Sequence, residues 1–126
     1  MAEPGRRFLP RRTPIEAYGA GGFRFADMSH RGSLLALPSG MHAWAVGEPG
    51  ALDETDFAPV VAEAGEIDLL LVGTGRELVS LPDALRWRLR DLGMAVEIMP
   101  TAAAIRTWNV LLAEDRRVAA ALVAVH

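Results

Sequence analysis

The sequence predicts one α/β domain of three layers, in which a mixed central sheet holds a C-terminal parallel βαβαβ unit and an N-terminal antiparallel meander. A chain of 126 residues suits a single domain, and 51% hydrophobic with 23% charged residues is typical of a globular protein. Residues 14–46 show short alternating runs between glycine and proline turns, typical of a meander. Residues 67–125 alternate apolar runs with helix-length segments, which predicts parallel strands joined by right-handed crossovers.

The N-terminal half is predicted to form short strands over residues 15–18, 23–28, 33–37 and 41–46. Glycine and proline clusters mark the turns between them. This meander is expected either to extend the central sheet or to form a third layer. After a loop over 47–52, a helix is expected over about 56–64, with Asp53 or Thr55 as its cap.

The C-terminal half is predicted to alternate strands over 67–72, 94–99 and 118–125 with two helices. Ser80–Asp83 has a capping-box pattern, and Gly93 is a typical stop for the helix that follows. The second helix is expected to begin at Pro100-Thr101 and to end near residue 113. The three strands should run in one direction, side by side.

Composition excludes several classes of chemistry. The chain has no cysteine and all thirteen basic residues are arginine, so thiolate and lysine chemistry are absent. Three scattered histidines lack the spacing of metal ligands, so no metal or cofactor is expected. Ser29-His30-Arg31 invites a nucleophile–base interpretation, but adjacent strand residues point to opposite faces. We expect no catalytic residues and, on balance, no enzyme.

Residues 1–13 are expected to form a flexible basic arm preceding a domain over 14–126. Four arginines and one glutamate give the arm a net charge of +3, so the rest of the chain carries −6. The acidic charge of the domain disfavours nucleic-acid binding, so nucleic-acid binding by the basic arm is the weakest of the hypotheses. No apolar run suits a signal peptide or a membrane span, and we therefore expect a cytoplasmic protein.

Several motifs together resemble a known family. They are Gly22–Phe25, Ser29–Ser33, Leu37–Gly40, Leu71–Gly75, Leu81-Pro82 and, most specifically, Val96–Leu111. In this order they resemble the domain-of-unknown-function family four-nine-eight, which includes mitochondrial complex I assembly factor three. The resemblance covers about residues 14–125 and departs from the family at Pro100, where an acidic residue is common, and at Trp108, where tyrosine is usual.

That resemblance implies a three-layer Mth-type α/β domain, no established catalysis and a protein-binding role. We therefore expect the function of a non-catalytic interaction or assembly-factor-like domain, with a link to respiratory complex I assembly and an unidentified protein partner. The alternative is a small-anion-binding protein or an undiscovered enzyme.

The anion hypothesis rests on the carboxyl edge of the predicted parallel strands, where ligands of open α/β sheets bind. Candidate ligand-binding residues there are Gly73, Thr74, Gly75, Arg76, Thr101 and Arg106. A helix N-terminus and two arginines favour an anion. The structural alternatives are a plain turn at 73–75, an N-cap role for Thr101 and an ion pair between Arg106 and Glu97. Asn109 is expected to bond a neighbouring backbone segment.

Candidate interaction residues lie on the helix after Pro82. Trp87 falls between its leucine face and its arginine face, flanked by Arg86 and Arg90. Tryptophan among arginines is typical of a protein-interface hot spot. The alternative is that Trp87 rests on the edge of the core.

Overall fold

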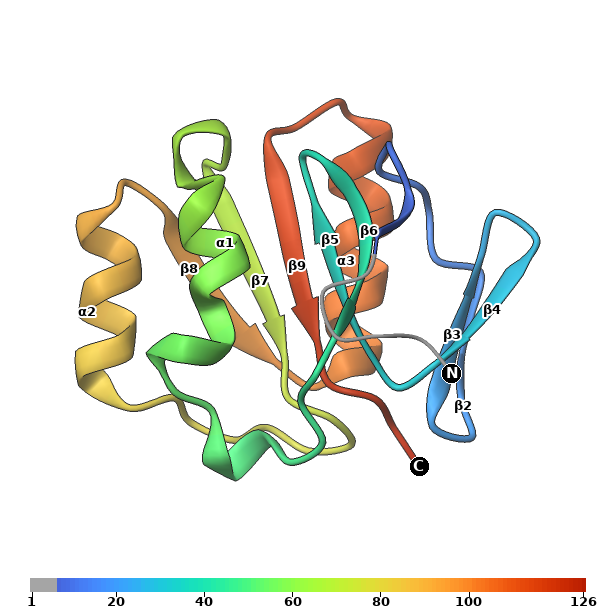
Figure 1. The fold of residues 1–126 in the computed structure, drawn as a ribbon, viewed down its shortest axis with the longest axis horizontal. Helices are drawn as coiled ribbons and strands as arrows, with labels where there is room; N and C mark the ends of the chain where they lie inside the picture. The colour runs from blue at the N-terminus through green and yellow to red at the C-terminus, as the bar shows by residue number, and fades with distance from the viewer. Residues whose placement is uncertain (1–6) are drawn as a thin grey trace.

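The computed structural model describes residues 7–126 (Figure 1). In this part of the chain the strands are β1 (Arg7–Leu9), β2 (Ala17–Gly19), β3 (Gly22–Phe25), β4 (Met28–Arg31), β5 (Ser33–Leu37), β6 (Gly40–Trp44), β7 (Leu69–Gly73), β8 (Ala95–Met99) and β9 (Val118–Leu122). The α-helices are α1 (Ala58–Ala62), α2 (Asp83–Asp91) and α3 (Thr101–Ala113), and short 3-10 turns form η1 (Pro49–Ala51), η2 (Glu54–Phe57) and η3 (Ala64–Glu66).

A six-stranded sheet in the order β1-β6-β5-β9-β7-β8 forms the centre of the molecule. β7 runs parallel to β8 on one side and to β9 on the other. β5 pairs antiparallel with both β9 and β6, and β1 pairs antiparallel with β6. The predicted mixed sheet with three adjacent, same-direction strands is therefore confirmed.

Helices cover both faces of this sheet (Figure 1). Because β8 and β9 flank β7 on opposite sides, two right-handed crossovers place α2 on one face and α3 on the other. α1 and α2 pack on the first face, while α3 and a separate three-stranded sheet, β2-β3-β4, pack on the second. The result is the three-layer arrangement that the sequence predicts.

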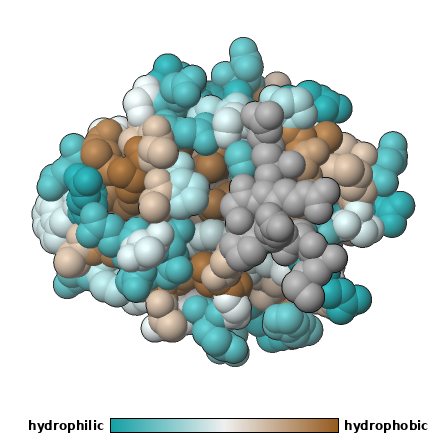
Figure 2. Space-filling view, viewed as in Figure 1, coloured by the Kyte–Doolittle hydropathy of each residue, from teal (hydrophilic) through white to brown (hydrophobic). Residues whose placement is uncertain are grey.

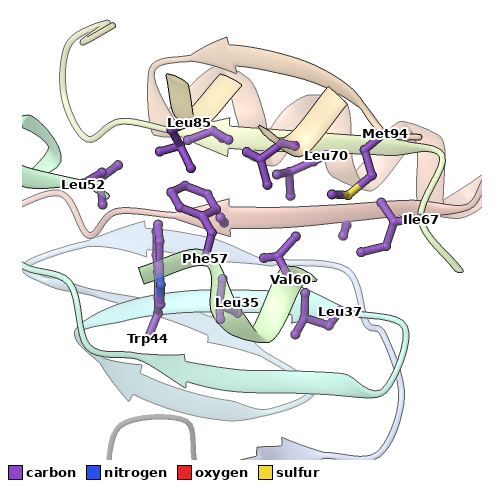
Figure 3. Packing of buried hydrophobic residues seen from close by; sticks show 14 of the residues in the cluster. Leu35, Leu37, Trp44, Leu52, Phe57, Val60, Ile67, Leu70, Leu85 and Met94 are labelled. Carbon is purple, nitrogen blue, oxygen red and sulfur yellow. The ribbon is translucent and has the colours of Figure 1, made fainter. Parts of the chain in front are cut away.

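Two apolar cores lie on the two sides of the sheet. In β5, Leu35 and Leu37 face the first core, whereas Leu34 and Ala36 face the second. The same alternation runs through β7 and β9, because a strand covered on both faces needs apolar residues at every position. Figure 3 shows Phe57 from η2 among the side chains of the first core.

The N-terminal meander divides between two sheets, whereas the sequence left the two placements as alternatives. β5 and β6 extend the central sheet, and β2, β3 and β4 form the small sheet beside α3. Gly32, with a φ of +102°, lies between β4 and β5 and donates its N–H to the Gly21 carbonyl at 2.7 Å. A positive φ here turns the chain out of one sheet and into the other.

The prediction of a flexible arm over 1–13 is wrong for residues 7–13, and residues 1–6 lie outside the described residues. Arg7–Leu9 pairs with β6. The Arg12 guanidinium donates to the carbonyl oxygens of Arg116 and Val118, and the carbonyl of buried Thr13 accepts from the Trp108 indole at 3.0 Å. Long-range hydrogen bonds order this segment despite its polar composition.

Local details of the helices also differ from the prediction. The expected helix over 56–64 is divided into η2, α1 and η3, and Asp53 caps it through a capping box with Asp56. The predicted capping box at Ser80 is wrong, because α2 begins at Asp83 after Pro82 without a side-chain cap. Gly93, with a φ of +93°, follows the end of α2 as predicted.

Candidate functional site

The structure brings four of the predicted ligand-binding residues together where β7 meets the start of α3. Thr101 is fully buried; its hydroxyl accepts from the Gly75 N–H at 2.8 Å and donates to the Val123 carbonyl at 2.7 Å. The Thr101 N–H donates back to the Gly75 carbonyl at 2.8 Å. A Cβ on Gly73 would lie 3.0 Å from Thr101 Cα, so this glycine allows α3 to approach β7 closely.

The hydrogen-bond donors of this junction are occupied within the protein. Thr74 donates its N–H to the Met99 carbonyl at 3.0 Å and its hydroxyl to the Glu77 carbonyl at 2.6 Å. Together with the bonds of Gly75 and Thr101, this leaves these residues no free donor for an anion. Thr101 is also not the N-cap that the sequence predicts, because it is the first helical residue after Pro100. Its hydroxyl instead ties α3 to β7 and β9.

Neither arginine of the predicted site, Arg76 or Arg106, forms a side-chain hydrogen bond with the residues of this junction. Arg76 donates to the carbonyl oxygen of His126 at 2.5 Å. Arg106 is exposed on α3, and Glu97 is exposed on β8. Among the ion pairs of residues 7–126, none joins Arg106 to Glu97, so that prediction is wrong. Its premise fails because β8 is an edge strand, in which a carboxylate stays in contact with water.

An open depression of about 390 Å³ lies at the same edge of the sheet. Its lining includes Arg76 and Glu77 after β7, Glu48 after β6, and the segment Val123–His126 after β9. The depression lies beyond the carboxyl ends of the neighbouring strands β7 and β9, and open α/β sheets bind ligands at that edge. Sequence reasoning missed Glu48, Glu77 and His126, because the position of β9 between β5 and β7 was not known.

The small sheet bears a second open depression, of about 380 Å³, whose lining includes Arg24, Ser29 and Arg31. His30 is buried, with Nε2 2.9 Å from the Ser33 carbonyl, while Ser29 is exposed. The prediction that Ser29 and His30 diverge is therefore confirmed. No group of three or more His, Asp or Glu side chains gathers as a metal site anywhere in residues 7–126.

The outer face of α2 carries the predicted interaction residues. Trp87 is 63% exposed, while Leu85 and Leu89 on the opposite face are buried. Arg90 is exposed, and Arg86 is half-buried with a hidden Nε that has no hydrogen-bond partner in the described chain. In Figure 2 an apolar area lies among hydrophilic side chains at the end of the molecule that α1 and α2 form. Trp87 is not among the side chains that pack against the first core, so it does not rest on the core's edge.

Comparison with known proteins places this fold in a family. Residues 15–123 match the family described as "Protein of unknown function (DUF498/DUF598)". An uncharacterised protein of Rhodobacter capsulatus is 47% identical over 109 residues, which cover 86% of this chain and 82% of that protein. NADH dehydrogenase [ubiquinone] 1 alpha subcomplex assembly factor 3 of mouse is 30% identical over 115 residues, covering 91% of this chain. The match spans only 62% of the mouse protein.

Solved structures agree with these sequence matches. A crystal structure described as an outer membrane protein from Bartonella henselae has a TM-score of 0.90 at 51% identity, covering 94% of this chain and 99% of that one. A Bordetella pertussis structure described as a Mth938-like domain has a TM-score of 0.77 at 28% identity, covering 88% and 85% of the two chains. Within residues 7–126, no helix has the length and apolar character to cross a membrane. The chain belongs to the DUF498/DUF598 family and has its Mth-type α/β fold.

Proposed function

We propose that this chain binds another protein in an assembly-factor-like role, and that the outer face of α2 is a contact surface. The observation that carries the proposal is the exposure of Trp87, 63% in the middle of α2. The alternative, an anion site at Gly73–Gly75, is not favoured, because the donors of that junction are already bonded.

The folding of α2 does not require a tryptophan at this position. Leu81, Leu85 and Leu89 supply the apolar contacts of this segment with the first core. A large aromatic side chain left in water adds apolar surface that association with a partner would remove. Arg90 lies one helical turn after Trp87 and is also exposed, so the two side chains share a face. Tryptophan and arginine are the residues most enriched in binding hot spots.

The described roles of several relatives indicate which kind of protein the partner is. Several curated relatives are assembly factors for NADH dehydrogenase, as in mouse and human, at 30% identity. We therefore propose that the partner belongs to respiratory complex I or to an intermediate of its assembly. This chain covers 62% of the mouse protein, so the shared domain is the part to which the proposal applies.

Affinity purification from native extract tests both parts of this proposal. Tagged wild-type protein is expected to enrich subunits of NADH dehydrogenase, quantified by mass spectrometry, and Trp87→Ala is expected to reduce that enrichment more than tenfold. Val110→Ala is the matched control, because Val110 is 57% exposed on α3. Failure of the wild type to enrich these subunits would contradict the complex I link. Equal enrichment by wild type and Trp87→Ala would contradict the α2 surface.

A further inference from the structure

The two edges of the central sheet differ in how they are protected. β1 is a three-residue edge strand whose pairing with β6 is interrupted by a register shift, a common way of blocking further pairing. β8 is a five-residue edge strand in unbroken parallel register with β7. Each of its residues is exposed or half-buried, whereas every residue of β5 and β9 is buried. β8 is therefore a regular, accessible edge.

The backbone bonds show which groups of β8 face outward. The Ala95 N–H donates to the Asp68 carbonyl at 2.9 Å, and the Met99 carbonyl accepts from the Thr74 N–H at 3.0 Å. Along a strand, the N–H and C=O of successive residues point alternately to opposite sides. Ala95, Glu97 and Met99 consequently bond to β7. Val96 and Ile98 direct their N–H and C=O groups away from the sheet.

Side chains of β8 present a distinctive pattern beside that edge. Val96 and Ile98 pack against the first core, on the α2 side, and Met99 packs against the second, on the α3 side. Glu97, two residues before Met99, faces the α3 side. It is exposed and makes no ion pair or side-chain hydrogen bond within residues 7–126. A strand laid against β8 would meet apolar, acidic and apolar positions in turn.

We propose that β8 is a strand-addition site for an extended segment of a protein partner with an apolar–basic–apolar pattern. The outward groups of Val96 and Ile98 would bond to the segment's backbone, and its basic side chain would lie beside Glu97. Opposite charges on neighbouring strands attract, and like charges repel. The inference rests on the proposed protein-binding function and adds a site that differs from the Trp87 surface. Figure 1 shows α2 and β8 at the same end of the molecule.

A second copy of this chain is a poorer occupant of the edge. In the antiparallel register that uses both outward residues of each copy, Val96 would pair with Ile98 of the other copy. Glu97 would then face its own equivalent in a close, non-hydrogen-bonded pair, about 4.5–5.5 Å between Cβ atoms. Two unpaired carboxylates at that separation disfavour the dimer. The charge pattern therefore favours a segment with lysine or arginine at that position.

Amide hydrogen exchange followed by NMR tests the site without knowledge of the natural partner. In the free protein, the amides of Val96 and Ile98 are expected to exchange faster than those of Ala95 and Glu97. The probes are two capped nine-residue peptides, one alternating valine with lysine and the other alternating valine with glutamate. Saturation with the lysine peptide is expected to slow exchange at Val96 and Ile98 at least tenfold, with roughly fivefold to tenfold weaker binding of the glutamate peptide.

Variants separate strand addition from other contacts. Val96→Pro removes an outward N–H that β7 does not use, so the fold should persist while the lysine peptide no longer protects Ile98. Glu97→Lys should reverse the preference between the two peptides. The proposal would be overturned if the lysine peptide did not slow exchange at the amides of Val96 and Ile98. It would also be overturned if Glu97→Lys kept the preference for the lysine peptide over the glutamate peptide. Trp87→Ala should leave peptide protection intact, so failure of the α2 surface and failure of the β8 site give different results.

Discussion

Replacement of Thr101 by valine tests whether its hydroxyl joins α3 to the sheet. Valine matches threonine in shape but lacks the oxygen that bonds the Gly75 N–H at 2.8 Å and the Val123 carbonyl at 2.7 Å. Thr101 is 0% exposed, so water cannot replace these bonds. One buried, unsatisfied polar group costs about 1–3 kcal/mol, so two such groups give an expected loss of about 2–6 kcal/mol. That is a large part of the roughly 5–15 kcal/mol that stabilises a domain.

Urea denaturation followed by circular dichroism measures this loss. With a slope of about 2 kcal/mol/M, the midpoint of Thr101→Val is expected to fall by about 1–3 M urea, with the slope itself unchanged. Thr101→Ser is the matched control, because it keeps the hydroxyl and loses one buried methyl group, at about 1 kcal/mol. The reasoning is refuted if Thr101→Val is as stable as wild type to within about 0.5 kcal/mol, since the buried bonds would then contribute nothing.

Three further predictions concern other contacts. The Asn109 side chain bonds both the N–H and the carbonyl of Ile15, at 2.8 and 2.9 Å. Asn109→Ala should therefore lower the free energy of unfolding by about 1–3 kcal/mol and speed amide exchange at Ile15. Unchanged exchange at Ile15 would contradict this prediction. Gly73→Ala places a Cβ within 3.0 Å of α3 and should cost about 1–3 kcal/mol by thermal denaturation, whereas Gly47→Ala, with nothing within 4 Å, should be nearly neutral. Arg88→Ala breaks an ion pair whose side chains are 46% and 63% exposed, so a stability change above about 1 kcal/mol would be unexpected.

Much of the local structure follows from the sequence. The apolar runs that form β5 and β7 and the alternating pattern of β6 predict strands that the structure confirms. α3 begins and ends where the sequence predicts, at Thr101 and Ala113. Asn109 bonds the backbone of Ile15, as its unfavourable position within a helix suggested. These features depend on short-range steric and hydrophobic preferences, which neighbouring residues already contain.

The candidate sites were less predictable because each depends on contacts between distant segments. Sequence alone placed Glu97 in a buried strand with Arg106 as its partner, but strand order leaves β8 at an edge. It offered Thr101 as a helix cap, whereas the Thr101 hydroxyl joins residues 26 and 22 positions away in the chain. It left open whether Trp87 rests on the core, and the packing of α2 leaves this side chain 63% exposed.

The sequence by itself determined most of the elements, their apolar faces and the parallel C-terminal unit, because hydrophobic periodicity and turn residues act over a few positions. Only the tertiary structure decided that the meander divides between two sheets, that residues 7–13 are ordered, and that β8 and Trp87 face solvent. The physical reason is that a strand is an edge, and a side chain is exposed, only when no other segment of the chain packs against it. That property belongs to the packed arrangement of the chain and to no local run of residues.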